Sequence, residues 1–212
     1  MSLRILVADD HEVVRQGICS ILKSHLGWEV CGEAVDGRQA VQMVKDLKPQ
    51  IVILDIAMPM LNGLDATRQI LNENADQKVL ILTMSDSEQL IREVLGAGAR
   101  GFVLKSDATT DLVAAVQALE RHGTYLTSRV RDILDHYFAP PSQKTLPTLT
   151  SREREVLQLI AEGKATKEVA VIFGRRVKTV ETHRSNFMAK LQLHSVSQVV
   201  LYAIRNGIIQ VN

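Results

Sequence analysis

The sequence predicts a doubly wound α/β domain with a five-stranded parallel sheet, followed by a small all-α domain. Short apolar runs alternate with amphipathic helical patterns over the first 121 residues, which favours a parallel sheet covered on both faces. The run at 51–54, Ile-Val-Ile-Leu, is aliphatic throughout, as expected for a strand buried on both sides. From residue 149 onward the patterns are helical. We therefore expect one domain over residues 1–121 and a second over residues 148–212.

Five apolar runs have the length of strands, and five amphipathic stretches have helical spacing. The strands are expected at residues 4–8, 29–32, 51–54, 79–82 and 101–104. The helices are expected at residues 11–24, 37–47, 63–71, 88–95 and 107–119. Ligands of such sheets bind beyond the carboxyl ends of the strands, so the residues that follow the strands are the first candidates for a site.

The chain changes character after residue 121. Residues 122–147 are expected to connect the two domains, with a helix over 128–138 and a proline-containing linker over 139–147. In the last part, Thr150 and Glu153 have the spacing of a capping box. Helices are expected there at residues 151–162, 166–172, 177–191 and 196–206, and the second and third have the layout of a helix-turn-helix.

Composition and charge narrow the classes of protein. Hydrophobic residues make up 46% of the chain and no apolar run approaches the roughly 20 residues of a membrane span, so a cytoplasmic protein without an export signal is expected. Cys19 and Cys31 lack metal or redox spacing and are expected to fill the core. Residues 148–212 carry ten Lys and Arg against five Glu, which suits nucleic-acid binding and equally a solvated surface.

Polar side chains follow four of the predicted strands. Asp9 and Asp10 follow the first strand, Asp55 the third, Thr83 the fourth and Lys105 the fifth. Three crowded carboxylates favour a hard divalent cation such as Mg²⁺, a lysine could bind a phosphoryl oxygen, and an aspartate could attack a phosphoryl donor. Alone, each residue also fits a helix cap or a solvated side chain; together they favour a site.

These residues lie in segments that resemble the receiver domain of bacterial two-component response regulators: Val7–His11, Val52–Pro59, Leu82–Ser85 and Gly101–Lys105. The resemblance implies the flavodoxin-like strand order 2-1-3-4-5. It also implies that Asp55 accepts a phosphoryl group from a histidine kinase, that Thr83 and Lys105 hold the phosphoryl oxygens, and that Thr83 and Phe102 move as a switch. The implied ligands of Mg²⁺ are Asp9, Asp10, Asp55 and the backbone carbonyl of Ala57.

Two positions depart from the common receiver pattern. Ser106 stands where many receivers have proline, and Phe102 lacks the hydroxyl of the commoner tyrosine, so its rotation would depend on packing alone. An aspartate-dependent phosphatase is the alternative chemistry. Those enzymes carry a second aspartate where this chain has Ala57, so an enzyme is not expected.

One face of the predicted helix at 177–191 is polar and the other has the spacing of a core. Spacing alone fits a solvated bundle as well as a DNA-binding surface. The segments Leu149–Leu157, Thr166–Ala170 and Lys178–Asn186, however, resemble the LuxR-type DNA-binding domain, and with the receiver they resemble the NarL/FixJ class of response regulators. This resemblance places Lys178, Glu181, Thr182 and Ser185 nearest the bases, and Lys167, Thr179, His183 and Arg184 nearest phosphates.

The resemblance also implies that the last helix pairs two such domains through residues such as Val199, Val200 and Ala203. The sharpest departure is Arg175-Arg176, where the family usually carries an apolar residue and then Ser or Thr. Arg176 falls where the recognition helix should be capped, so a weaker helix start is expected. One hypothesis is that these arginines compensate by contacting DNA phosphate.

The expected protein is a phosphorylation-dependent transcriptional regulator with Mg²⁺ as its cofactor. Its expected partners are a sensor histidine kinase and double-stranded promoter DNA, with RNA polymerase as a further candidate and no membrane. A homodimer is expected when the protein is phosphorylated or bound to DNA. One alternative is a helical domain that binds protein or RNA. The other is a phosphorylation-independent regulator, against which the complete set of Asp9, Asp10, Asp55, Thr83 and Lys105 argues.

Overall fold

The chain divides into two compact units, Met1–Pro141 and Ser142–Asn212, and each is described by itself. The computed structural model describes residues 2–127, 130–131 and 149–209. The predicted linker over 139–147 and all but two residues of the predicted helix over 128–138 lie outside the described residues. Within the described part, no helix is long and apolar enough to cross a membrane.

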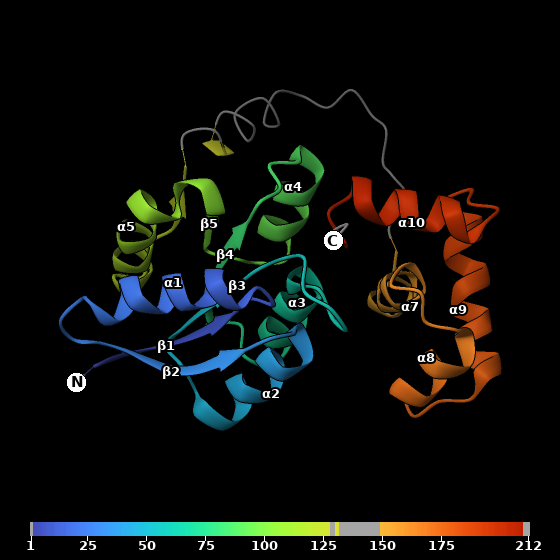
Figure 1. Cartoon of the computed structure of the whole chain (residues 1–212), viewed down its shortest axis with the longest axis horizontal. Helices are drawn as coiled ribbons and strands as arrows, with labels where there is room; N and C mark the ends of the chain where they lie inside the picture. The colour runs from blue at the N-terminus through green and yellow to red at the C-terminus, as the bar shows by residue number, and fades with distance from the viewer. Residues whose placement is uncertain (1, 128–129, 132–148, 210–212) are drawn as a thin grey trace. The chain divides into compact units, whose positions relative to one another are not determined.

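The first unit is built on a parallel sheet with the order β2-β1-β3-β4-β5-β6 (Figure 1). The predicted order of five strands is confirmed, and one short strand is added at the edge. β6 covers two residues and pairs with β5, so the sheet continues past residue 121, where we expected the domain to end. Two residues are too few to show an alternating pattern. The strands are β1 (Leu3–Ala8), β2 (Trp28–Ala34), β3 (Ile51–Leu54), β4 (Lys78–Thr83), β5 (Gly101–Leu104) and β6 (Tyr125–Leu126).

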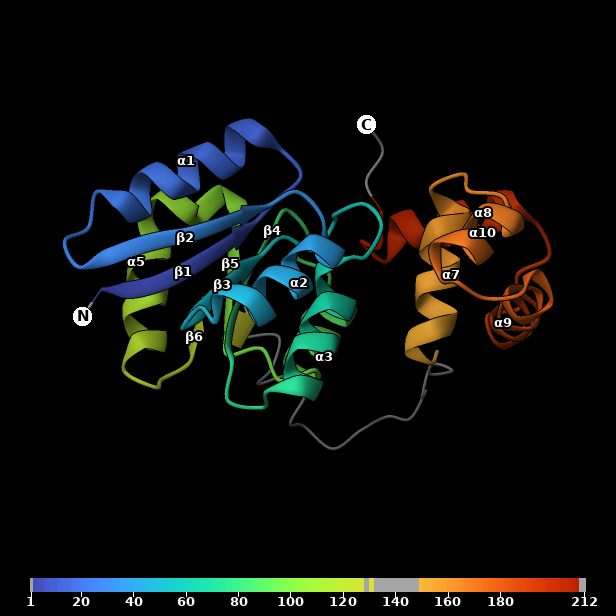
Figure 2. The same ribbon diagram turned by 90° about the horizontal axis from the view of Figure 1, so that it is seen from below.

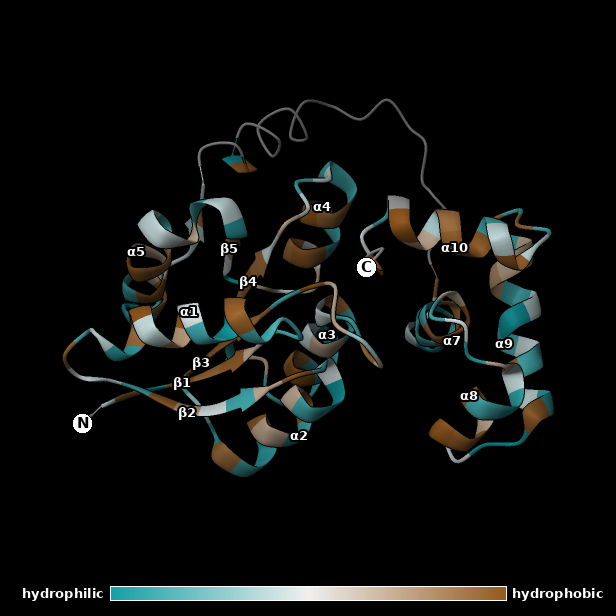
Figure 3. Ribbon diagram, viewed as in Figure 1, coloured by the Kyte–Doolittle hydropathy of each residue, from teal (hydrophilic) through white to brown (hydrophobic). Residues whose placement is uncertain are grey.

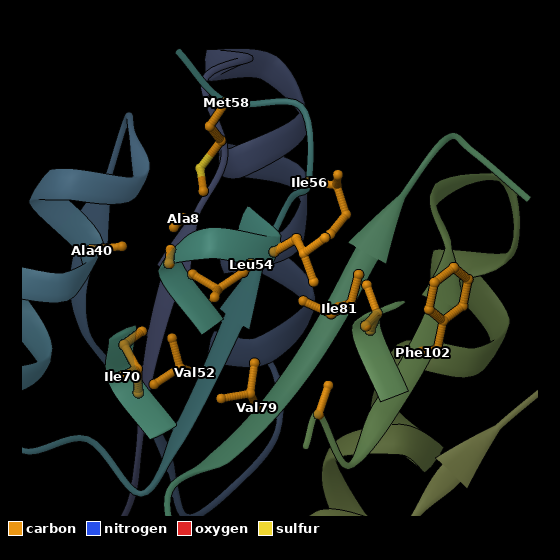
Figure 4. Packing of buried hydrophobic residues seen from close by; sticks show 14 of the residues in the cluster. Ala8, Ala40, Val52, Leu54, Ile56, Met58, Ile70, Val79, Ile81 and Phe102 are labelled. Atoms are coloured by element: carbon orange, nitrogen blue, oxygen red, sulfur yellow. The ribbon is translucent and has the colours of Figure 1, made fainter. Parts of the chain in front are cut away.

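Helices cover both faces of this sheet, as Figures 1 and 2 show. Alternate residues along a strand point to opposite faces. Ile51 and Ile53 of β3 therefore pack in the layer with α1 and α5, and Val52 and Leu54 in the layer with α2, α3 and α4 (Figure 4). The helices are α1 (Glu12–Lys23), α2 (Gly37–Leu47), α3 (Gly63–Glu73), α4 (Glu88–Gly96) and α5 (Ala108–Glu120), with a 3₁₀ turn at Lys105–Asp107.

The second unit is a small bundle in which α7 packs against α9 and α10, and α8 packs against α9. The predicted capping box opens α7: the Thr150 side chain accepts the backbone N–H of Glu153, and the Glu153 carboxylate accepts the backbone N–H of Thr150. Figure 3 shows how hydrophobic and polar residues are distributed over the helices of this unit. They are α7 (Ser151–Ala161), α8 (Thr166–Ile172), α9 (Val177–Lys190) and α10 (Val196–Arg205).

The expectation that the cysteines fill the core is confirmed for Cys19 and is wrong for Cys31. Cys19 lies on the buried face of α1, and Cys31 is half-buried on β2. Burial raises the pKa of the Cys19 thiol to about 11, and it also raises that of Cys31. Both are therefore protonated and unreactive near neutral pH.

Candidate functional site

The register of the sheet brings the four polar strand ends to one edge. The ladder pairs Ala8 with Leu54, so the residues that follow, Asp9 and Asp55, lie side by side. The Asp55 N–H continues the ladder by donating to the carbonyl of Ala8 at 2.9 Å. Thr83 is the last residue of β4, and Lys105 follows β5 directly.

Lys105 contacts the two buried acids at this edge of the sheet. Its ammonium Nζ lies 2.8 Å from Oδ2 of Asp9 and 2.9 Å from Oδ2 of Asp55. Each of these aspartates is 1% exposed. The other oxygen of Asp55, Oδ1, accepts the N–H of Ile56 at 2.8 Å. One ammonium thus serves two buried carboxylates, which leaves an excess of negative charge at this edge.

The pKa values of Asp55 and Lys105 reflect this excess of negative charge. Burial raises the pKa of the Asp55 carboxyl; the Lys105 ammonium offsets part of the rise and the Asp9 carboxylate adds to it. Burial alone would lower the pKa of Lys105, but the carboxylates of Asp55 and Asp9 outweigh burial and raise it. Lys105 is therefore a permanent cation, and an additional cation would relieve the repulsion between the acids.

The donor set fits a hard divalent ion. Ligand atoms of Asp9, Asp10, His11 and Asp55 all lie within 4.8 Å of one another. Carboxylate oxygens are preferred ligands of Mg²⁺, and they suit it better than the single imidazole. The His11 Nδ1 lies 2.9 Å from Oδ1 of Asp10. The histidine is therefore better suited to orient that carboxylate than to bind the ion itself. Ala57 lies two residues after Asp55, half-buried in the same loop, where only its backbone carbonyl could serve as a ligand.

Two glycines that the sequence analysis did not single out shape this loop. A Cβ at Gly63 would lie 2.0 Å from the carbonyl oxygen of Asp55, and a Cβ at Gly37 would lie 2.1 Å from that of Leu61. The Gly63 N–H donates to the carbonyl of Ile56, and the Gly37 N–H donates to that of Leu61. The Asn62-Gly63 pair, a helix cap followed by glycine, is the sequence signal that could have indicated the close approach.

The expected switch residues are both buried. The Thr83 hydroxyl accepts the N–H of Ser85 at 3.2 Å. This hydrogen bond also fits the alternative in which Thr83 only stabilises the turn after β4. Phe102 is fully buried beside Ile81, its register partner on β4 (Figure 4). Ser106, in the position that proline often takes, lies in the 3₁₀ turn and donates its hydroxyl hydrogen to Asp107.

The eight residues expected at DNA all lie on α8 and α9. Most of their side chains are exposed, and those of His183 and Arg184 are half-buried. Arg184 donates to the Thr166 hydroxyl at 3.3 Å and so connects α9 to the start of α8. The exposed members of the set are Lys167, Lys178, Thr179, Glu181, Thr182 and Ser185.

Comparison with known proteins identifies both units. Residues 5–117 match the family model of the response regulator receiver domain, and residues 147–203 match that of the bacterial regulatory proteins of the luxR family. The chain is 34% identical over 209 residues to the transcriptional regulatory protein LiaR of Bacillus subtilis, covering 98% of this chain and 99% of LiaR. This chain belongs to the NarL class of response regulators.

Further relatives of this response regulator support the same family assignment. It is 37% identical over 217 residues to the oxygen regulatory protein NreC of Staphylococcus epidermidis, covering 98% of the chain and 100% of NreC. It also resembles the structure of RcsB from Salmonella enterica serovar Typhimurium bound to promoter rprA in the presence of the phosphomimetic BeF₃⁻. The TM-score is 0.67 at 27% identity, with 95% of this chain and 98% of RcsB covered. It is therefore a transcriptional regulator with a LuxR-type DNA-binding domain.

The start of α9 in this response regulator lacks a side-chain cap. Arg176 occupies the cap position of α9, as predicted, and makes no capping hydrogen bond with its side chain. Arg176 takes part in this turn through its backbone: the Thr179 N–H donates to the Arg176 carbonyl at 2.9 Å. The first turn of α9 also contains no acidic residue, so nothing there compensates the helix dipole.

The expectation for the last helix of this response regulator is partly wrong. Val199 and Ala203 are buried in the core of their own unit, since they lie on the side of α10 that packs against α7. They cannot pair two domains while that core is intact. Val200 is half-buried, whereas Val196, at the start of α10, and Leu201 are exposed.

Proposed function

We propose that Asp55 of this response regulator accepts a phosphoryl group from a sensor histidine kinase. The observation that carries the proposal is the bridging position of Lys105, whose ammonium contacts both Asp55 and Asp9. In the transfer, an oxygen of the Asp55 carboxylate forms a bond to phosphorus while the bond from phosphorus to the kinase imidazole breaks. The imidazole leaves with that electron pair.

The residues around Asp55 have complementary parts in this step. The carboxylates of Asp9, Asp10 and Asp55 and the backbone carbonyl of Ala57 would hold Mg²⁺, which when bound neutralises the charge of the acids and of the incoming phosphoryl group. The Lys105 ammonium would remain beside Asp55 and receive a phosphoryl oxygen.

The switch is proposed to involve Thr83 and Phe102. Thr83 would exchange the Ser85 N–H for a phosphoryl oxygen, to which its hydroxyl donates. The Phe102 ring is already fully buried in this structure. Phosphorylation would therefore favour a conformation that the ring can already adopt, rather than create a new one.

The output is proposed to be binding of promoter DNA by α9 as a homodimer. Lys178, Glu181, Thr182 and Ser185 would face base edges. The support is their exposure on one helix, the basic character of residues 148–212, and the RcsB structure described as bound to a promoter. The exposed Val196 and Leu201 of α10 are the candidates for the dimer contact, in place of the buried Val199 and Ala203. RNA polymerase remains a candidate partner.

The test follows oligomeric size and duplex-DNA binding with and without Mg²⁺ plus a small phosphodonor. Wild type is compared with Asp55→Ala and with a matched control, Asp76→Ala, whose side chain is fully exposed between α3 and β4. The donor should promote dimerisation and DNA binding in wild type and in the control, and not in Asp55→Ala. If all three proteins respond alike, Asp55 does not control output and the regulator is phosphorylation-independent.

A further inference from the structure

A pocket opens on one flank of the recognition helix. Its volume is about 280 Å³. It is formed by the start of α7, the turn between α8 and α9, and the first two turns of α9. Its lining residues are Arg152, Phe173, Arg175, Thr179, Val180 and His183.

The lining is basic and one of its arginines is held in place. The Arg152 guanidinium lies over the Phe173 ring, 4.9 Å from the ring centroid, and donates to Glu155 at 2.9 Å. An arginine fixed on both sides loses little conformational freedom when it binds an anion. Glu155, however, balances its charge.

Arg175 supplies the net positive charge of the pocket. Its side chain is exposed, and among the described residues it forms no ion pair. The Thr179 hydroxyl and the His183 imidazole add two groups that can donate hydrogen bonds. The neighbouring Arg176 does not line the pocket, although it carries the same charge.

The pocket lies beside the face proposed to read the bases. Successive residues of a helix turn by about 100°, so Thr179 and His183, four residues apart, share one flank of the stripe that includes Lys178 and Thr182. Arg184 lies on the opposite flank, where it contacts Thr166 of α8. A helix in the major groove lies between two phosphate backbones, so each flank would face one of them.

We propose that this pocket binds a backbone phosphate of duplex DNA. Guanidinium groups, a hydroxyl and an imidazole are the side chains that proteins use for such phosphates. The assignment rests on the proposed function, because it requires α9 to lie in the groove. It identifies Arg175 as the residue whose charge the phosphate needs, and it gives Arg176 a lesser role.

The test measures binding of the full-length chain to a short duplex of mixed sequence over a range of salt concentrations, with Mg²⁺ and the phosphodonor present. Each phosphate neutralised contributes about 0.9 to the slope of log affinity against log salt. Arg175→Gln should reduce the slope by about that amount and weaken binding to all sequences alike. Arg175→Lys should retain most of the slope, and Arg176→Gln should change it much less.

The outcomes separate this inference from the proposed function. The phosphate assignment is overturned if Arg175→Gln leaves the salt slope unchanged, or if Arg175→Gln and Arg176→Gln reduce it equally. DNA binding by α9 would stand in either case. Failure of wild type to bind duplex DNA overturns the proposed function itself. Circular dichroism of each variant verifies that the helices remain folded.

Inorganic phosphate is the second probe. At matched ionic strength it should not compete with DNA, because the pocket holds the phosphate only together with the neighbouring helix face. Competition by phosphate that disappears in Arg175→Gln would assign the pocket to the free anion and overturn its assignment to DNA.

Discussion

The loop that carries Asp55 into α3 has no space for a side chain at Gly63. An added Cβ would lie 2.0 Å from the carbonyl oxygen of Asp55 and 2.8 Å from its carbonyl carbon. The φ angle of Gly63 is outside the left-handed region, so the requirement for glycine comes from this close approach. Gly63→Ala must therefore displace the backbone that holds Asp55.

The size of the effect follows from these contacts. Ordinary contacts of a Cβ begin at 3.4 Å, so the two segments must separate by more than an ångström. Such a shift breaks the hydrogen bond from the Gly63 N–H to the Ile56 carbonyl, worth about 1 kcal/mol. Overpacking strain adds about 1–3 kcal/mol. We expect Gly63→Ala to lower the free energy of unfolding of this unit by about 2–4 kcal/mol.

Urea unfolding followed by fluorescence measures this loss. Trp28 is the only tryptophan of the chain and lies on β2, so it reports the first unit alone. Gly17→Ala is the matched control: Gly17 lies inside α1 with no atom within 4 Å of an added Cβ, and alanine should stabilise that helix by about 0.5–1 kcal/mol. Labelling of Asp55 by a small phosphodonor should fall in Gly63→Ala alone. Stability of Gly63→Ala within about 0.5 kcal/mol of wild type would refute the reasoning.

Three further outcomes are expected. Burial raises the pKa of Glu153, but the Lys190 ammonium at 2.7 Å and the Thr150 backbone outweigh it and hold this pKa below its usual value. The ion pair therefore stabilises the second unit fully at pH values above the usual pKa of a glutamate. Its contribution disappears as the pH falls through the lowered pKa of Glu153. Because the Lys190 side chain is 38% exposed, Lys190→Met should reduce hydrogen-exchange protection of α7 by only about 1–2 kcal/mol near neutral pH. A reduction that persists in acid would contradict this. Arg176→Ser should add a side-chain cap and raise protection of the first turn of α9 by about 1 kcal/mol; equal exchange in both proteins would show that the cap is not limiting. Alkylation at pH 8 should leave Cys19 unmodified until the first unit unfolds, and rapid labelling of the native protein would contradict the burial of this thiol.

Local signals explain which elements the sequence predicted closely. The helix expected at 37–47 is found with those bounds because Asp36 caps its start, where its side chain accepts the N–H of Gln39, and Lys48 ends it in a left-handed conformation. The strand at 51–54 also has its predicted bounds, because its aliphatic run ends at Asp55. The polar strand ends could be placed together because parallel strands bring their carboxyl ends to one edge.

Features that depend on distant partners could not be predicted in this way. The spacing of α10 identifies its apolar residues, but only the packing of α7 decides that Val199 and Ala203 lie inside while Leu201 lies outside. Likewise, the need for glycine at 63 arises from a carbonyl eight residues earlier in the chain, and no local pattern records that distance.

The contacts around Thr83 limit how far phosphorylation alone could shift the receiver. Lys105 contacts Asp55 before any transfer, so it would distinguish the two states only weakly. Thr83 would exchange a neutral hydrogen bond with Ser85, worth about 0.5–1.5 kcal/mol, for one to a charged oxygen, worth about 1.5–3 kcal/mol. A difference of about 1–2 kcal/mol shifts an equilibrium roughly tenfold, whereas conversion from one state to the other requires about 5.5 kcal/mol. Since Phe102 is already buried, the remaining free energy would have to come from contacts made only in the active assembly. In the proposed function, those would be the contacts between two copies and with DNA. Dimerisation and promoter binding would then be part of the switch itself rather than consequences of a completed change in the receiver.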